Sequence, residues 1–169
     1  MADLFQETVI LSLGSNLGDS KINILKAISL LKEKGFSVSD ISSFYKTSPV
    51  GKTDQPDFIN CAIIGSTLLL PHELLAVCKE IETILGRDQK SPHWSARIID
   101  IDIIFFGCRK IKSPDLTVPH PMFAGRLFVL MPVAEIAPDF ALPDGVRFAD
   151  FWDSIRASEI FSNQIIEII

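Results

Sequence analysis

Two aspartates stand two residues apart in the most hydrophobic run of the sequence. The run reads RIIDIDIIFFG over residues 97–107, and Asp100 and Asp102 interrupt it. Aspartate is uncommon in strands, and a buried carboxylate without a partner is unfavourable. Because alternate residues of a strand point to opposite faces, the two carboxylates share one face, about 6.6 Å apart. Such a pair suits a hard cation such as Mg²⁺, although a solvated strand face would explain it equally well.

Basic residues near the pair favour the metal interpretation. Arg97 opens the run, and Arg87 lies ten residues earlier. Arginine can hold phosphate with two parallel hydrogen bonds, and Mg²⁺ usually shares its ligands between protein carboxylates, phosphate oxygens and waters. The segment therefore predicts a site for a metal ion and a polyphosphate.

Size and charge limit the classes of protein that fit. The chain has 169 residues, of which 47% are hydrophobic, so we expect one core and a single domain over residues 1–169. The 16 basic residues against 21 acidic ones give a net charge of −5, which argues against nucleic-acid and membrane partners. The N-terminus carries acids where a signal peptide carries Lys or Arg, and the cysteines lack metal-binding spacing. We expect a cytoplasmic protein, and a monomer in preference to an oligomer.

The elements that must position the aspartates follow from hydrophobic periodicity. Strands are predicted at residues 8–13, 36–46, 58–69 and 97–107, and helices at 20–34 and 71–85. Asp19 is the expected N-cap of the first helix, and Gly35 and Gly86 are the expected stops. The order β-α-β-β-α-β predicts an α+β, ferredoxin-like fold, with an antiparallel sheet and both helices on one face. A C-terminal extension follows, with a helix near residues 126–136.

This topology assigns the two faces of the strand that carries the aspartates. Ile99, Ile101, Ile103 and Phe105 are expected to pack against the helices. The two aspartates then lie on the helix-free face, which is the one left for a ligand.

Three further features stand in loops. GSNLGD at residues 14–19 lacks the spacing of a phosphate-binding loop and is interpreted as a turn. His120 lies in TVPHP, and its distance from His72 and His93 does not suit a zinc site. Trp94, in a polar loop, suits an aromatic lid over a flat ligand.

Several motifs together resemble a known family. In chain order they read LGSNLGD, FYKTSPVGKTDQPDFIN, a Glu82–Arg87 pair, RIIDIDIIFFG, LTVPHP and GRLFVLMPVAEIAPD. Their order and spacing are similar to those of 6-hydroxymethyl-7,8-dihydropterin pyrophosphokinases of folate biosynthesis. The resemblance extends from about Val9 to Asp144 and leaves the C-terminal tail unmatched.

The resemblance implies an enzyme that transfers pyrophosphate from ATP to the hydroxymethyl group of the pterin and releases AMP. It implies that Asp100 and Asp102 hold two Mg²⁺ ions and act with Arg87 and Arg97 in catalysis. The implied nucleotide-binding residues are Glu82, Arg87, Trp94, Arg97, Thr117, His120 and Arg126. The implied pterin-binding residues are Thr47, Ser48, Val50, Phe58, Asn60, Asp100 and Phe128, with the two phenylalanines on either side of the ring. The general base stays open between Asp102 and a metal-bound water.

Two other functions share parts of this pattern. An RNA-recognition module has the same topology but needs aromatic residues on its two central strands, and TVILSLG and FINCAIIG do not supply the motif. A metal-dependent phosphohydrolase would explain the two aspartates but not the aromatic pair and Asn60. Formation of AMP rather than free phosphate would separate it from a pyrophosphokinase.

Overall fold

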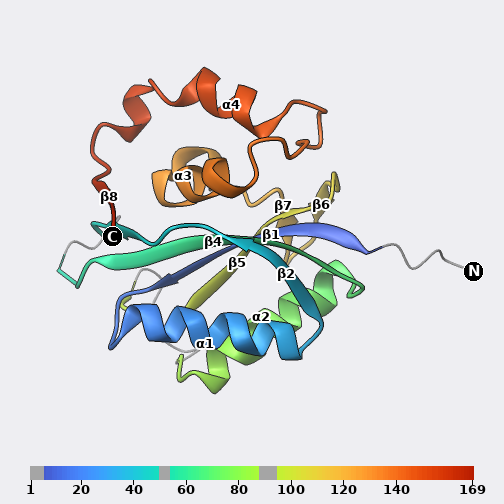
Figure 1. Cartoon of the computed structure of the whole chain (residues 1–169), viewed down its shortest axis with the longest axis vertical. Helices are drawn as coiled ribbons and strands as arrows, with labels where there is room; N and C mark the ends of the chain where they lie inside the picture. The colour runs from blue at the N-terminus through green and yellow to red at the C-terminus, as the bar shows by residue number, and fades with distance from the viewer. Residues whose placement is uncertain (1–5, 50–53, 88–94) are drawn as a thin grey trace, which may run out of the picture.

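The computed structural model describes residues 6–49, 54–87 and 95–169 (Figure 1). The strands are β1 Glu7–Ser15, β2 Phe36–Ile41, β3 Tyr45–Thr47, β4 Phe58–Thr67, β5 Asp100–Phe106, β6 Ile111–Lys112, β7 Thr117–Val118 and β8 Ile166–Ile168. The α-helices are α1 Ser20–Glu33, α2 Pro71–Ile84, α3 Leu127–Ile136 and α4 Phe148–Ile155. Short 3₁₀ turns, η1 and η2, cover Phe123–Gly125 and Glu159–Phe161.

The main sheet is antiparallel, with strand order β5-β1-β4-β3-β8. Strand β2 also pairs with β4, so β2 and β3 share this neighbour. The single strand predicted over residues 36–46 is therefore two short strands. They separate at Ser42, whose backbone N–H donates to the Ala62 carbonyl and whose Oγ accepts from the Ala62 N–H, both at 2.9 Å. The serine side chain replaces a strand carbonyl, so the chain can bend without leaving a buried amide unpaired.

Helices cover both faces of this sheet. Helices α1 and α2 lie on one face, while α3 and α4 lie on the other, as Figure 1 shows. The prediction that one face is free of helices is thus wrong for most of the sheet, because the C-terminal extension folds back onto it. Part of that face, near the start of β5, is left as a pocket.

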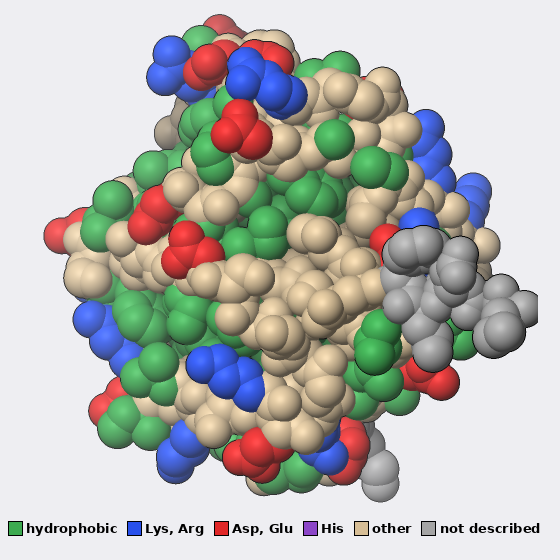
Figure 2. Space-filling model, turned by 45° about the vertical axis from the view of Figure 1, so that its right-hand side comes forward, with side chains coloured by type: hydrophobic (Ala, Val, Ile, Leu, Met, Phe, Trp, Pro, Cys, Tyr) green, Lys and Arg blue, Asp and Glu red, His purple; other side chains and the backbone are tan. Residues whose placement is uncertain are grey.

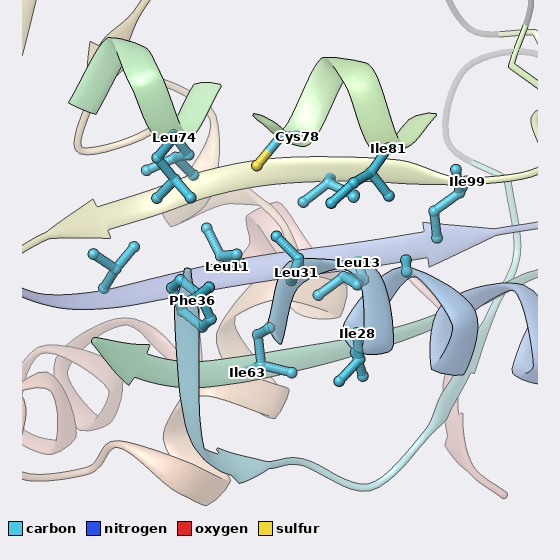
Figure 3. Close-up of a cluster of buried hydrophobic side chains, with 14 of the residues drawn as sticks. Leu11, Leu13, Ile28, Leu31, Phe36, Ile63, Leu74, Cys78, Ile81 and Ile99 are labelled. Carbon is cyan, nitrogen blue, oxygen red and sulfur yellow. The ribbon is translucent and has the colours of Figure 1, made fainter. Parts of the chain in front are cut away.

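The layer between the sheet and α1/α2 is the larger core (Figure 3). On α2, Leu74, Cys78 and Ile81 are fully buried. On α1 the buried stripe is Ile24, Ala27, Ile28 and Leu31, an i, i+3, i+4, i+7 set. The caps are as predicted. Asp19 accepts from the N–H of Ile22, and Gly35 and Gly86 adopt φ of 95° and 97°.

Strand β5 contains a bulge that was not predicted. Leu11 faces Ile103, whereas the preceding residue of β1, Ile10, faces Phe105, so Ile104 is the extra residue. Ile99, Ile101 and Ile103 face α1 and α2 as expected, but Ile104 and Phe105 both pack against α3 and α4. The alternation fails at Phe105 because the bulge shifts the face of every later residue by one.

The surface agrees with the charge of the chain. On the face shown in Figure 2, acidic and basic side chains of the described residues are interspersed, without a continuous basic stripe. Among the helices that the structure describes, none combines the length and the apolar character needed to span a bilayer.

Candidate active site

A pocket of about 350 Å³ opens where β1, β3, β4 and β5 meet the start of α3. Its lining is Ser12, Gly14, Thr47, Ser48, Gln55, Phe58, Asn60, Lys79, Arg87, Arg97, Asp100, Asp102, His120, Arg126 and Phe128. The pocket therefore brings together most of the residues that the sequence suggested. Glu82 and Thr117 do not line it, and Val50 and Trp94 lie outside the described residues.

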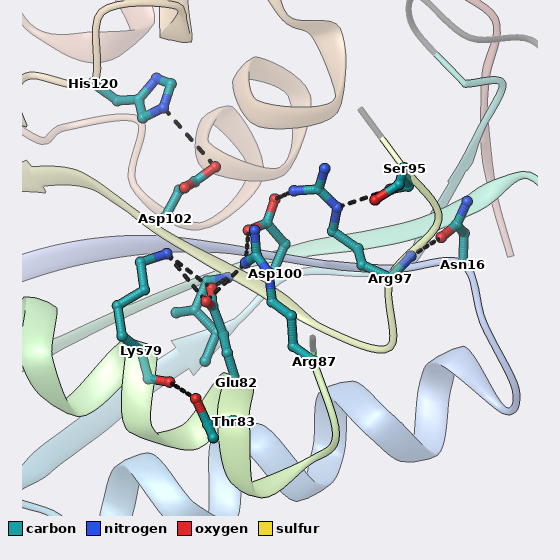
Figure 4. A network of polar contacts seen from close by, with 11 residues as sticks. Asn16, Lys79, Glu82, Thr83, Arg87, Ser95, Arg97, Asp100, Asp102 and His120 are labelled. Carbon is teal, nitrogen blue, oxygen red and sulfur yellow. Dashed lines mark hydrogen bonds and ion pairs between the residues drawn. The ribbon is translucent and has the colours of Figure 1, made fainter. Parts of the chain in front are cut away.

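Asp100 is held between two arginines (Figure 4). Its Oδ1 pairs with Nη1 of Arg87, and its Oδ2 lies 2.7 Å from Nη1 of Arg97. Burial disfavours the charged carboxylate, but the positive charges of Arg97 and Arg87 outweigh burial and lower the pKa of Asp100. Asp100 is thus ionised at neutral pH and orients both guanidinium groups toward the pocket.

Asp102 has a different environment, although it is only two residues away. Among the described residues, only His120 lies within ion-pair distance, with Nε2 3.9 Å from Oδ2 of Asp102. Burial, together with the negative charge of Asp100, raises the pKa of Asp102 to about 6. Among the described residues, the two arginines thus pair with Asp100, and Asp102 has no comparable ion pair.

His120 is neutral at pH 7. Burial and the nearby Arg126 lower the pKa of His120 to about 4. Its Nδ1 accepts a hydrogen bond from the N–H of Met122 at 3.1 Å, so the proton belongs on Nε2, which faces Asp102. The N–H of His120 donates to the carbonyl of Ile104, so the bulge in β5 also fixes this loop.

Glu82 lies beneath the charged end of the pocket and is fully buried. Its Oε1 accepts from the N–H of Ile101 at 2.8 Å, and its Oε2 pairs with Arg87 at 2.8 Å and with Lys79 at 3.1 Å. Burial raises the pKa of Glu82 against the opposing effects of Lys79 and this backbone N–H. In this conformation the Glu82 carboxylate pairs with Arg87 and Lys79, which line the pocket, but it does not line the pocket itself.

The other end of the pocket is built mainly from neutral side chains, with the guanidinium of Arg126 at its border, 5.5 Å from the centroid of the Phe128 ring. Phe58, Asn60 and Thr47 come from the adjacent strands β4 and β3, and Phe128 comes from the first turn of α3. Nδ2 of Asn60 donates to Oγ1 of Thr47 at 2.8 Å, which fixes the direction of the buried amide. A Cβ at position 14 would lie 2.7 Å from Oδ1 of Asn60, so glycine is required there for the side chain to reach the pocket.

Four lining residues were not identified from the sequence, namely Ser12, Gly14, Gln55 and Lys79. Lys79 stands three residues before Glu82 on α2, a spacing that places both on one face of a helix and that could have indicated the pair. Asn16, in the GSNLGD turn, accepts from the N–H of Arg97 and donates to Gln55 and to the carbonyl of Pro56. These partners are 39 to 81 residues distant in sequence, so no local pattern reveals this anchor.

The donor set suits a metal that is shared with a phosphate. Among the described residues there is no group of three or more His, Cys, Asp or Glu side chains that could hold a metal ion. Two carboxylates on one strand face offer at most part of a coordination shell, and Mg²⁺ commonly completes its shell with phosphate oxygens and waters. Asp100 and Asp102 fit that arrangement and do not fit a metal centre made by the protein alone.

Comparison with known proteins agrees with this geometry. The pattern of the 7,8-dihydro-6-hydroxymethylpterin-pyrophosphokinase family matches residues 10–138. The chain belongs to this family.

Relatives within the family differ in length. The chain is 42% identical over 127 residues to 2-amino-4-hydroxy-6-hydroxymethyldihydropteridine pyrophosphokinase of Bacillus subtilis, with 75% of each protein covered. It is 41% identical over 149 residues to a folate synthesis bifunctional protein of Arabidopsis thaliana, which covers 88% of this chain but only 31% of that protein. The chain thus spans about a third of the bifunctional relative.

A solved structure shows the same fold. The crystal structure of wild-type Plasmodium falciparum HPPK-DHPS with pteroate superimposes with a TM-score of 0.70 at 16% sequence identity. The match covers 94% of this chain and 44% of the other. At this identity the likeness is evidence of fold alone, and it supports a mixed α/β architecture with an antiparallel sheet.

Proposed function

We propose that this pyrophosphokinase-family chain transfers the pyrophosphoryl group of ATP to the hydroxymethyl oxygen of 6-hydroxymethyl-7,8-dihydropterin and releases AMP. One observation carries the proposal. A single pocket joins a charged end, in which two aspartates stand beside Arg87 and Arg97, to a neutral end built from two phenylalanines and an amide. A nucleotide polyphosphate and a flat heterocycle with a polar edge are the two ligands that these ends match.

The charged end acts by binding and orienting phosphate. Arg87 and Arg97 already point at Asp100, and they can exchange this partner for phosphate oxygens with little loss of side-chain freedom. Asp100 and Asp102 would hold Mg²⁺, in two ions according to the family resemblance, and the metal supplies charge neutralisation at the phosphates. His120, Arg126 and Lys79 surround the same space. Trp94 and Thr117 stay candidates for nucleotide contact, and Glu82 is proposed to act through Arg87 and Lys79.

The neutral end orients the acceptor. Phe58 and Phe128 would lie against the faces of the pterin, while Asn60, Thr47, Ser48 and the backbone of Val50 would recognise its polar edge. Asn60 uses Nδ2 for Thr47, so its Oδ1 remains directed toward Gly14 and the pocket, where it can accept from a ring N–H. In phosphoryl transfer, a protein contributes to catalysis mainly by positioning, here by holding the hydroxymethyl oxygen in line with the phosphate.

We further propose a ferredoxin-like core, a single domain and a cytoplasmic, monomeric protein. The strand order β5-β1-β4 followed by β2 and β3 supports a ferredoxin-like core over a single domain, with α3, α4 and β8 as its extension. The free thiols of Cys61, Cys78 and Cys108 support a reducing, cytoplasmic environment. The cover of α3 and α4 over the sheet opposes an RNA-binding role.

The test is a product assay with the purified chain, ATP and Mg²⁺, in the presence and absence of the pterin. We expect AMP to accumulate only when the pterin is present, one molecule for each pterin consumed. Release of inorganic phosphate without the pterin would identify a phosphohydrolase instead, and ADP as the product would exclude pyrophosphoryl transfer.

A further inference from the structure

The C-terminal tail, residues 159–169, is attached to the protein at two places that adjoin the pocket. At one end, Phe161 is 7% exposed and belongs to the core under α3 and α4. At the other end, β8 pairs with β3, and the N–H of Ile169 donates to the carbonyl of Phe44 at 3.0 Å. Figure 1 shows β8 beside the sheet below α3, so the tail crosses from one layer to the other.

Gln164 lies between these two attachments and contacts the start of α3. Helix α3 has Arg126 as its N-cap, and the Arg126 side chain makes no capping hydrogen bond. Instead, Oε1 of Gln164 accepts from the N–H of Leu127 at 2.9 Å, and Nε2 donates to the carbonyl of Gly125 at 2.8 Å. A carboxamide suits this position because one group must both accept and donate. The tail thus supplies the cap that the helix lacks in its own sequence.

The residue between these two backbone contacts is Arg126, and the residue after them is Phe128. Both side chains line the pocket, and the guanidinium of Arg126 lies over the ring of Phe128, 5.5 Å from its centroid. Fixing the backbone of Gly125 and Leu127 therefore fixes the direction from which both side chains enter the pocket. Loss of the cap would leave the first turn of α3 free to fray.

The same tail contacts the opposite wall. Ile166 is paired with Thr47, and the N–H of Ser48 lies 3.4 Å from the carbonyl of Ile165. Thr47 in turn holds the amide of Asn60. One short segment thus connects the Phe128 wall to the Thr47–Asn60 wall, the two sides between which the pterin is proposed to bind.

We propose that Gln164 is a positioning residue for the pterin and that residues 164–169 act as a strap that sets the width of the neutral end of the pocket. This inference rests on the proposed function, since it assigns Phe128 and Asn60 to the pterin. Gln164 acts through the first turn of α3 and does not touch the substrate. Its loss should widen the pterin site and also loosen Arg126, but it should disturb phosphate binding less, because Arg87 and Arg97 are attached to other elements.

The experiment compares Gln164→Ala with Asn163→Ala, its matched control. Asn163 is the adjacent amide, exposed to solvent. Titration calorimetry would measure pterin affinity with α,β-methylene-ATP and Mg²⁺ at saturation, and nucleotide affinity by itself. We expect pterin Kd to rise roughly three- to tenfold in Gln164→Ala, the range that follows from loss of a helix cap. Nucleotide Kd should change by less than half as much, and the control should match the wild type.

A conservative variant separates positioning from general damage. Gln164→Glu keeps an acceptor for the N–H of Leu127, where the helix N-terminus favours negative charge, but it loses the donor to the carbonyl of Gly125, so its pterin affinity should lie between those of Gln164→Ala and the wild type. Equal pterin affinity in wild type and Gln164→Ala would overturn the strap proposal, even if the alanine variant melts at a lower temperature. Equal loss for both ligands would also overturn it. A wild-type chain that binds no pterin at all would instead refute the proposed function, and with it this inference.

Discussion

The two ends of the pocket are held together by different forces. At the charged end, Asp100, Arg87, Glu82 and Lys79 form a chain of ion pairs that is complete before any ligand binds. At the neutral end, the side chains are held in place by packing and by a hydrogen bond between Asn60 and Thr47. A buried charge without a partner is unfavourable, so the protein prearranges the ion pairs of Asp100, Arg87, Glu82 and Lys79. A neutral surface can be left open for a flat ligand without that requirement.

The charged end is also unequal within itself. Asp100 has two arginine partners and a lowered pKa, while Asp102 lacks a contacting cation among the described residues and has a raised pKa. The difference indicates that a metal ion arriving with the nucleotide would make its most favourable electrostatic interaction with Asp102. Removing either carboxylate should therefore damage phosphate chemistry and leave the neutral end intact.

The largest expected effect is on turnover after Asp100→Asn or Asp102→Asn. Each variant removes a proposed metal ligand, and charge stabilisation worth several kcal/mol predicts a loss of about 10³-fold in kcat. Circular dichroism should show an intact fold. Turnover close to wild type at saturating Mg²⁺ in either variant would mean that the metal assignment is wrong.

At the neutral end, Phe58→Ala should weaken pterin binding by about 1–2 kcal/mol through lost ring contact. The KM for ATP should hardly change, because Phe58 lies on β4, apart from the arginines. Steady-state kinetics with each substrate varied in turn would measure both constants. Equal losses for both substrates would indicate misfolding and remove the distinction between the two ends.

The pH dependence of stability provides a test in the absence of ligand. The native pKa of Asp102 is about 6, above its usual value of 3.8, so the native state holds its proton longer and stability falls as pH rises from about 4 to about 6. The native pKa of His120 is about 4, below its usual 6.5, so this group makes stability rise with pH over nearly the same range. The two effects oppose each other in the wild type.

Substitution should reveal each effect separately. In Asp102→Asn the contribution of Asp102 is removed, so between about pH 4 and 6 the unfolding free energy should rise with pH more steeply, or fall less steeply, than in the wild type, by on the order of 1 kcal/mol after solvent screening is allowed for. In His120→Gln the slope should change in the opposite direction relative to the wild type. Urea titrations in metal-free buffer would measure both slopes. Profiles of the two variants that run parallel to each other would contradict the assigned environments.

The smallest expected effect concerns Thr47→Val, which keeps the size of the side chain and removes the acceptor for Asn60. Loss of one neutral hydrogen bond should lower pterin affinity by about 1 kcal/mol and leave nucleotide affinity unchanged. Val9→Ile is a suitable control because Val9 lies in the core between the sheet and α1/α2 and does not line the pocket. An effect on nucleotide affinity as large as that on the pterin would show that the two ends are not independent.

The elements that can be predicted from the sequence are those governed by local rules. Helix α1 between Asp19 and Gly35 and helix α2 between Pro71 and Gly86 follow from caps, glycine stops and a 3.6-residue period. The aspartate pair and the two arginines follow from residue type and spacing. Each of these signals lies within about twenty residues of chain.

The features that could not be predicted depend on contacts between distant segments. The bulge at Ile104 arises from the register with β1, and the division of residues 36–46 into two strands depends on Ser42 meeting Ala62 on β4. The packing of α3 and α4 on the second face of the sheet could not be predicted, because it depends on where the C-terminal extension folds back. The same is true of Gln164, which caps a helix 37 residues earlier in the chain.

The two ends of one pocket are proposed to divide the two substrates between them. The most direct test is the Mg²⁺-dependent affinity of wild type, Asp102→Asn and Phe58→Ala for α,β-methylene-ATP, measured by titration calorimetry. We expect the affinity to fall about tenfold or more in Asp102→Asn, since a proposed metal ligand is lost. In Phe58→Ala it should stay within about twofold of wild type, because the lost ring contact belongs to the pterin. A Phe58→Ala variant that loses nucleotide affinity as strongly as Asp102→Asn would contradict the account.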